Sequence, residues 1–125
     1  MPEVFQYAVL QVVPSIERGE RLNVGVVVHA RRLQFLQVAV HLDEDRLRAL
    51  APDLDTDALR AHLDGLERVA RGDPAAGAVA LLDRSERFHW LVAPSSTIVQ
   101  AGAVHTGLCD DAEALVARLL HELVR

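Results

Sequence analysis

The chain has 125 residues, half of them apolar, and a formal net charge of −5 at pH 7. This length suits a single domain over residues 1–125, and the apolar content excludes a disordered chain. The negative charge disfavours nucleic acid and anionic membranes as partners. Aromatic side chains make up 4% of the residues, which is too few for a base-stacking platform.

Cysteine and histidine spacing gives no sign of a cofactor. Cys109 is the only cysteine, so an intrachain disulfide and a cysteine-rich zinc site are both excluded. The six histidines show no metal-site spacing, and no phosphate-binding glycine motif occurs. No apolar run approaches the roughly 20 residues that a membrane span needs, and the first residues lack the order of a signal peptide. We therefore expect a cytoplasmic protein with no metal, cofactor or membrane partner.

The first third of the chain shows the two-residue alternation of β-strands. Val4–Val13 is apolar on both faces, which is typical of an interior strand. A polar turn around Gly19 leads to a second predicted strand over Leu22–Ala30. A third strand is predicted over Leu33–Leu42. Because the connections are short, these strands are expected to form an antiparallel meander.

From Asp43 onward the apolar period changes to about 3.6 residues, which predicts helices. Asp43 can cap a short helix that ends at Leu50. Asp55 or Thr56 can open a longer helix that ends at Gly72. The apolar stripe of this helix contains Leu59, Leu63, Leu66 and Val69.

The last third of the chain is less regular. Residues 75–84 fit either an Ala-rich helix or a loop, and Ser85 can cap a short helix, although a strand also fits there. The inward positions of this short segment are Phe88, Leu91 and Val92. A fourth strand is predicted over Thr97–Val104, and Asp110 or Asp111 can cap a final helix. The buried side of that helix would carry Leu115, Val116, Leu119, Leu120 and Leu123.

These elements predict an α+β fold, a mostly antiparallel sheet of three to four strands with helices packed on one face. In the second strand, one face carries Val24, Val26 and Val28. We expect the helices to cover that face. Asn23, Gly25 and His29 would then lie on the opposite face, toward solvent, another element of the fold or a partner.

Asn23, the only asparagine in the chain, lies in a strand, where this residue is disfavoured. Together with Arg18 and Glu20 it offers donors and acceptors for a polar ligand or a partner's backbone. Gly25 lacks a Cβ, so a ligand or partner can approach the sheet closely. An architectural interpretation fits as well: Gly19 supplies a positive φ, Arg18 pairs with Glu20, Asn23 satisfies a buried backbone group, and Gly25 accepts a neighbouring aromatic ring.

A second candidate site lies at His105 and Thr106, between the predicted fourth strand and the final helix. A histidine beside a hydroxyl and a helix start can bind an anion or act as a base. The alternative is a polar loop that ends in a helix cap. Arg31 and Arg32 are interpreted as a charged hairpin tip, and Cys109 as a small buried hydrophobic residue.

Four blocks of sequence resemble a known family. They are Val12–Pro14, Arg18–Val27, Asp45–Leu50 and Val104–Gly107. In these blocks the chain resembles the bacterial domain-of-unknown-function family 3037, and the resemblance spans nearly the whole chain. Its specific part is the proline, the turn and the Asn-Val-Gly-Val sequence. Proteins of this family are often encoded beside a HipA-like kinase, so the resemblance implies a partner or regulator of such a kinase.

Two functions of different classes follow. The first is a non-catalytic interaction or regulatory module for a HipA-like kinase, because the family context implies such a partner and the sequence shows no catalytic constellation. The alternative is a small-molecule or nucleotide-binding or processing domain that uses Arg18, Glu20 and Asn23 with His105. A structural homodimer, formed through an open sheet face, is a third interpretation.

Overall fold

A computed structural model describes residues 1–95 and 97–125. The strands are β1 (Glu3–Val12), β2 (Leu22–Ala30), β3 (Phe35–Val40), β4 (Val99–Ala101) and β5 (His105–Cys109). The α-helices are α1 (Glu44–Leu50), α2 (Thr56–Arg71), α3 (Arg84–Val92) and α4 (Ala112–Leu123). Three short 3₁₀ helices are η1 (Arg31–Leu33), η2 (Pro74–Ala76) and η3 (Ala78–Leu81). The predicted α+β class, with helices packed against an antiparallel sheet, is confirmed.

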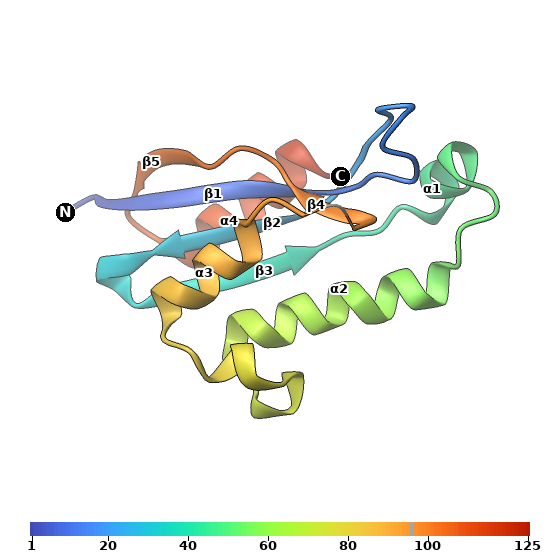
Figure 1. Cartoon of the computed structure of the whole chain (residues 1–125). Helices are drawn as coiled ribbons and strands as arrows, with labels where there is room; N and C mark the ends of the chain where they lie inside the picture. Colours follow the sequence, from blue (N-terminus) through green and yellow to red (C-terminus); the bar gives the residue numbers. More distant parts are fainter. Residues whose placement is uncertain (96) are drawn as a thin grey trace.

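The sheet is built around β1, which pairs with β2 on one edge and with both β4 and β5 on the other. The strand β3 continues the sheet beyond β2 (Figure 1). Every pairing is antiparallel, so the expected N-terminal meander and the interior position of β1 are confirmed.

The end of the chain contributes two short strands where the sequence predicted one strand followed by a loop. Leu10 pairs with Ala101 and Tyr7 pairs with His105. Two residues of β1 therefore lie opposite the three residues 102–104, and this extra residue interrupts the pairing between β4 and β5. The prediction of a loop at His105 and Thr106 is therefore wrong, because the free edge of the ten-residue β1 offers backbone hydrogen bonds along nearly its whole length.

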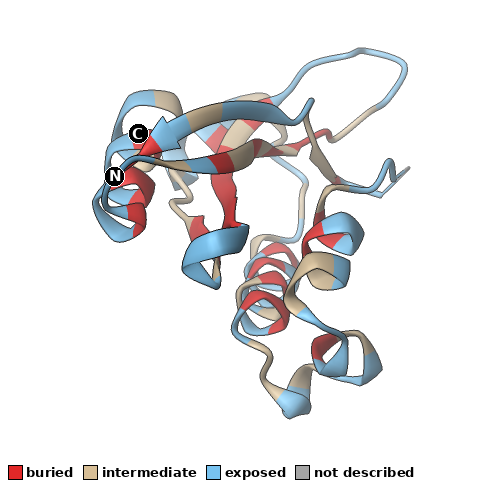
Figure 2. Cartoon of the chain, turned by 90° about the vertical axis from the view of Figure 1, so that its left-hand side faces the viewer, coloured by how far each residue is buried: buried red, intermediate tan, exposed pale blue. Residues whose placement is uncertain are grey.

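The helices lie on both faces of the sheet, rather than on the one face that was expected. The helices α2 and α3 pack against a core that includes Leu10 and Val27, and α4 packs against Val26 and Val28 on the other face. Figure 2 shows the buried residues of the helices on the sides that face the sheet. Within the described residues, no helix is long and apolar enough to cross a bilayer.

A β-bulge in β2 explains why the expected face was wrong. Leu10 pairs with Gly25, whereas the next residue of β1, Gln11, pairs with Asn23. Val24 is therefore an extra residue, and it packs in the core beneath α2 and α3 while Val26 packs beneath α4. The prediction assumed strict alternation and so placed Val24 and Val26 on the same face, but the extra residue moves Val24 to the other face.

Aspartate caps set the starts of the four α-helices. The side chains of Asp43, Asp55 and Asp111 accept backbone hydrogen bonds at the starts of α1, α2 and α4. Asp43 was the predicted cap of α1, and Asp55 and Asp111 were each one of two predicted candidates. The helix α3 begins at Arg84 because the carboxylate of Asp83, rather than Ser85, accepts the N–H of the third helical residue at 2.8 Å. The uncertain segment before it contains η2 and η3.

Candidate functional site

The side chain of Asn23 is occupied by contacts within the protein. Its Nδ2 donates to the carbonyl oxygen of Leu123 at 3.0 Å, and its Oδ1 accepts from Nε2 of Gln11 at 3.0 Å. Gln11 in turn accepts from Arg21 at 3.1 Å. This chain of hydrogen bonds joins β1 and β2 to the last turn of α4.

A second side chain reaches the same end of α4. Arg46 of α1 donates to the carbonyl oxygen of Val124 at 3.4 Å. The last carbonyls of a helix lack partners within the helix and carry partial negative charge, so an amide and a guanidinium suit them well. Asn23 and Arg46 belong to two of the sequence blocks described above, and their shared partner is the end of α4.

Arg18 and Glu20 form an exposed ion pair, with 74% and 48% of their side chains accessible. The hydrogen bond to Glu20 is the main cause that raises the pKa of the Arg18 guanidinium. Gly19 between them has a φ of 72°, in the left-handed region that glycine adopts readily. The expected ion pair and positive φ are present, and a role of these residues in binding stays a prediction.

Gly25 allows the neighbouring strand β3 to lie close to β2. A Cβ at this position would lie 2.7 Å from the backbone oxygen of Ala39 in β3. The atoms nearest to that Cβ belong to Ala39, Val40 and Leu10 rather than to an aromatic ring, so that part of the architectural interpretation is wrong. The glycine that accepts an aromatic ring is Gly107, where a Cβ would lie 2.7 Å from the ring of Phe5.

The structure does not bring His105 and Asn23 together. His105 lies opposite Tyr7, and their ring centroids are 5.1 Å apart. Asn23 lies opposite Gln11, which is further along β1 by about 13 Å at roughly 3.3 Å per residue. Thr106 points to the other face of the sheet, opposite Gln6, where both residues line a cavity.

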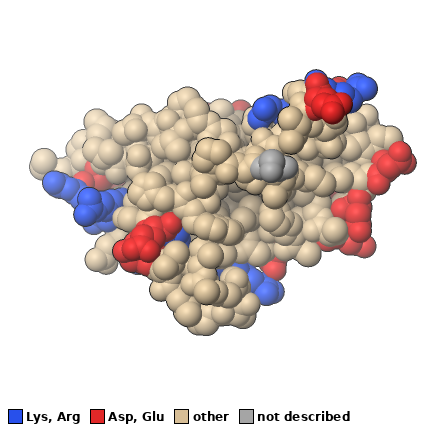
Figure 3. Space-filling model, viewed as in Figure 1, with Lys and Arg blue, Asp and Glu red and all other residues tan. Residues whose placement is uncertain are grey.

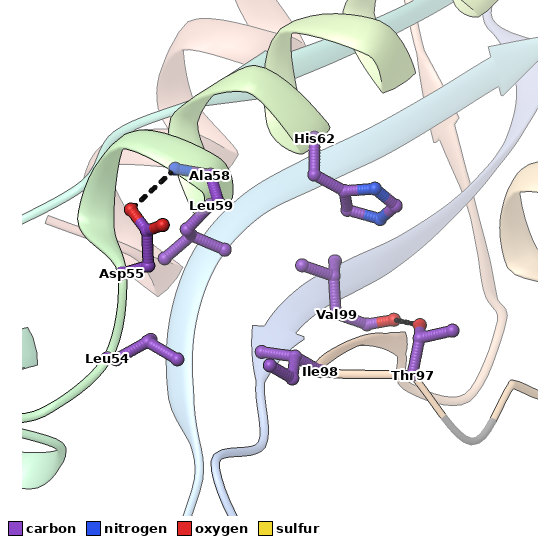
Figure 4. Close-up of a pocket in the computed structure, with 8 residues that line it drawn as sticks. All are labelled: Leu54, Asp55, Ala58, Leu59, His62, Thr97, Ile98 and Val99. Carbon is purple, nitrogen blue, oxygen red and sulfur yellow. Dashed lines mark hydrogen bonds between the residues drawn. The ribbon is translucent and has the colours of Figure 1, made fainter.

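An apolar groove that the sequence did not predict runs between the start of α2 and β4 (Figure 4). Its volume is about 380 Å³. The lining residues are Leu54, Asp55, Ala58, Leu59, His62, Thr97, Ile98 and Val99. An adjoining hollow of about 270 Å³ shares His62, Thr97 and Val99 with the groove and extends to Trp90. Ile98 and Trp90 are large apolar side chains with 43% and 46% of their surface exposed.

One end of the groove lies at an acidic segment. Asp55 lines the groove, and Asp53 and Asp57, its neighbours at the start of α2, are exposed as well. Figure 3 shows acidic side chains at this right-hand end of the molecule and a largely uncharged surface over the middle of the same face. The groove therefore offers apolar contacts at its centre and negative charge at one end. Within residues 1–95 and 97–125, no three His, Cys, Asp or Glu side chains gather to hold a metal ion.

The fold is of the α+β class, and comparison with known proteins gives the family of the chain. The family model described as "Protein of unknown function (DUF3037)" matches residues 7–124. The chain belongs to this family. No curated protein and no solved structure matches the chain.

Proposed function

We propose that the protein is a non-catalytic interaction module that binds an apolar segment of a partner protein in the groove between α2 and β4. The observation that carries this proposal is the apolar lining of the groove beside the exposed Ile98 and Trp90. Contiguous exposed apolar surface with a polar rim is typical of protein interaction sites.

The partner that the family resemblance implies is a HipA-like kinase. The exposed Asp55 that lines the groove, with Asp53 and Asp57 close to it in sequence, favours a segment that carries basic residues beside its apolar anchor. One buried leucine or phenylalanine side chain would contribute about 1.5–3 kcal/mol to binding, so a single anchor in this groove has a measurable effect.

The alternative, a ligand-processing site of Arg18, Glu20, Asn23 and His105, has less support. Asn23 is hydrogen-bonded on both its nitrogen and its oxygen. His105 lies opposite Tyr7, four residues along β1 from the position opposite Asn23. A homodimer through the groove competes directly with the kinase as an occupant, and light scattering of the purified chain distinguishes these two.

The test is calorimetric titration of a HipA-like kinase, the partner that the family resemblance implies, into the wild type and two variants. Ala58→Arg places a long cation over the groove from an exposed position of α2, without removing a core residue. Ala61→Arg makes the same change at an exposed position of α2 that does not line the groove.

We expect Ala58→Arg to weaken binding by at least about tenfold, which corresponds to about 1.4 kcal/mol. Ala61→Arg should bind like the wild type. Equal binding by both variants would place the interface elsewhere. No complex at micromolar concentration, or a dimer that Ala58→Arg dissociates, would overturn the kinase as the occupant.

A further inference from the structure

A second cavity lies at the other end of the sheet, away from the start of α2. Its volume is about 530 Å³, and β1, β2, η1 and β5 all contribute to its walls. The polar lining includes Gln6, His29, Arg31, Arg32 and Thr106. Since ligand pockets commonly measure about 300–1,000 Å³, this space suits a small organic molecule rather than a bare ion.

His29 is the side chain that marks this cavity as unusual. Its exposed fraction is 5%, and its ring stacks on Phe88 of α3 with centroids 4.7 Å apart. Neither ring nitrogen has a hydrogen-bond partner among the residues that the structure describes. A buried polar group without a partner is rare in folded proteins and calls for a specific explanation.

The charges around His29 are mainly positive. Arg31 and Arg32 line the cavity from η1, and their side chains are exposed. Burial lowers the pKa of His29, and the positive charges of His89, Arg84 and Arg31 lower it further. One acidic residue, Glu3, also lines the cavity. Figure 3 shows basic side chains at this left-hand end of the molecule, with acidic side chains next to them.

The turn that presents the two arginines is well defined. The N–H of Gln34 donates to the carbonyl of Arg31 at 3.1 Å, and Gln34 adopts a left-handed φ of 52°. Because the guanidinium group is planar and carries several donors, it matches the oxygen atoms of phosphate groups in a bidentate manner. Two neighbouring arginines on one fixed turn are therefore suited to a phosphoryl group.

We propose that this cavity binds a small organic phosphate. Arg31 and Arg32 hold the phosphoryl oxygens, and the Thr106 hydroxyl and the Gln6 amide add donors from the adjacent strands. The ring of His29 and the side chain of Val4 form the wall that contacts the organic part of the ligand. This site is separate from the groove between α2 and β4, and neither proposal depends on the other.

The test is calorimetric titration of the full chain with ribose 5-phosphate, inorganic phosphate and ribose. We expect ribose 5-phosphate to bind more tightly than phosphate, and ribose not to bind, because the arginines recognise the phosphoryl group and the wall contacts the sugar. The double variant Arg31→Gln/Arg32→Gln should weaken binding by at least about tenfold. The control Arg118→Gln/Arg125→Gln removes the same charge at exposed positions in α4 and after it, and should bind within about twofold of the wild type.

Three results would overturn the proposal. The first is no binding of ribose 5-phosphate at about 10 mM, which is weaker than a specific site requires. The second is an equal loss in the two double variants, which would show attraction to net charge alone. The third is equal affinity for phosphate and ribose 5-phosphate, which would leave the organic part without contacts. Thr106→Val removes the hydroxyl donor and nearly preserves the side-chain volume at an exposed position of β5. It therefore tests the contribution of that donor without disturbing the core.

Discussion

The strand β2 carries two polar side chains, Asn23 near its start and His29 near its end, and they lie in opposite surroundings. Asn23 is hydrogen-bonded to Gln11 and to the carbonyl of Leu123. His29 is more deeply buried, and neither of its nitrogens has a partner among the described residues. The bulge at Val24 places the two side chains on opposite faces of the sheet.

This difference separates a residue that stabilises the fold from one that marks a binding site. The hydrogen bonds of Asn23 hold the end of α4, so its conspicuous position in a valine-rich strand has a structural explanation. His29 makes no such bonds among the described residues, and the cavity beside it is lined by Arg31 and Arg32. A polar residue in a strand is therefore best judged by its hydrogen-bond partners rather than by its rarity in the sequence.

The largest effect is expected at Gly25, which lies between the two polar residues. Gly25→Ala places a Cβ 2.7 Å from a backbone oxygen of β3, and because a central strand cannot easily move, it should lower the free energy of unfolding by about 3 kcal/mol. Gly65→Ala is the control, since nothing lies within 4 Å of its Cβ and alanine favours the helix by up to about 1 kcal/mol. Urea unfolding measures both changes, and equal stability of the two variants would contradict the close approach.

Asn23→Ala tests the structural half of the comparison. It removes two hydrogen bonds and leaves the carbonyl of Leu123 without this donor, so we expect a loss of about 2 kcal/mol in urea unfolding. Glu20→Ala, which breaks only an exposed ion pair, should leave the midpoint unchanged. If Asn23→Ala is as stable as the wild type, these bonds do not hold α4.

The smallest effect concerns the protonation of His29. Its pKa in the folded protein lies below the ordinary value of 6.5 because burial disfavours the charged ring, and His89, Arg84 and Arg31 add repulsion. As the pH falls below about 6.5, the unfolded chain takes up a proton that the folded chain does not, so stability decreases. His29→Phe keeps a ring against Phe88 and removes this contribution.

Thermal unfolding measured between about pH 7.5 and 5 gives the comparison, with His121→Phe as a control at an exposed position of α4. We expect the midpoint to fall less steeply with acid in His29→Phe than in either the wild type or the control. Parallel pH profiles for all three proteins would show that His29 titrates in the folded state as it does in the unfolded state.

Local signals were sufficient to predict much of the fold. The aspartate caps at Asp43, Asp55 and Asp111 and the apolar stripe of α2 depend on residues within one or two turns. All of them were among the predicted positions, with one alternative each for the caps of α2 and α4. The bounds of β2 were also predicted as observed. The division of the last strand was missed because the pairing partner, β1, lies about 100 residues earlier in the chain.

The candidate sites were harder to predict because the role of each residue depends on contacts with residues far away in the sequence. Nothing in the sequence near Asn23 indicates that its donor reaches residue 123, and a one-residue bulge reverses the face on which Val24 packs. The groove in Figure 4 joins residues of α2 to residues of β4, which share no motif. Thr106 was a candidate, but its neighbours in the cavity, Gln6 and His29, became apparent only from the pairing of β5 with β1.

The most direct test of the contrast within β2 is a nuclear magnetic resonance titration of the labelled protein with ribose 5-phosphate. We predict that the backbone amide signals of residues 29–32 and 106 shift progressively with ligand, and that those of Asn23 and Leu123 stay in place. Shifts centred on Asn23 and the end of α4, with residues 29–32 unchanged, would contradict the account.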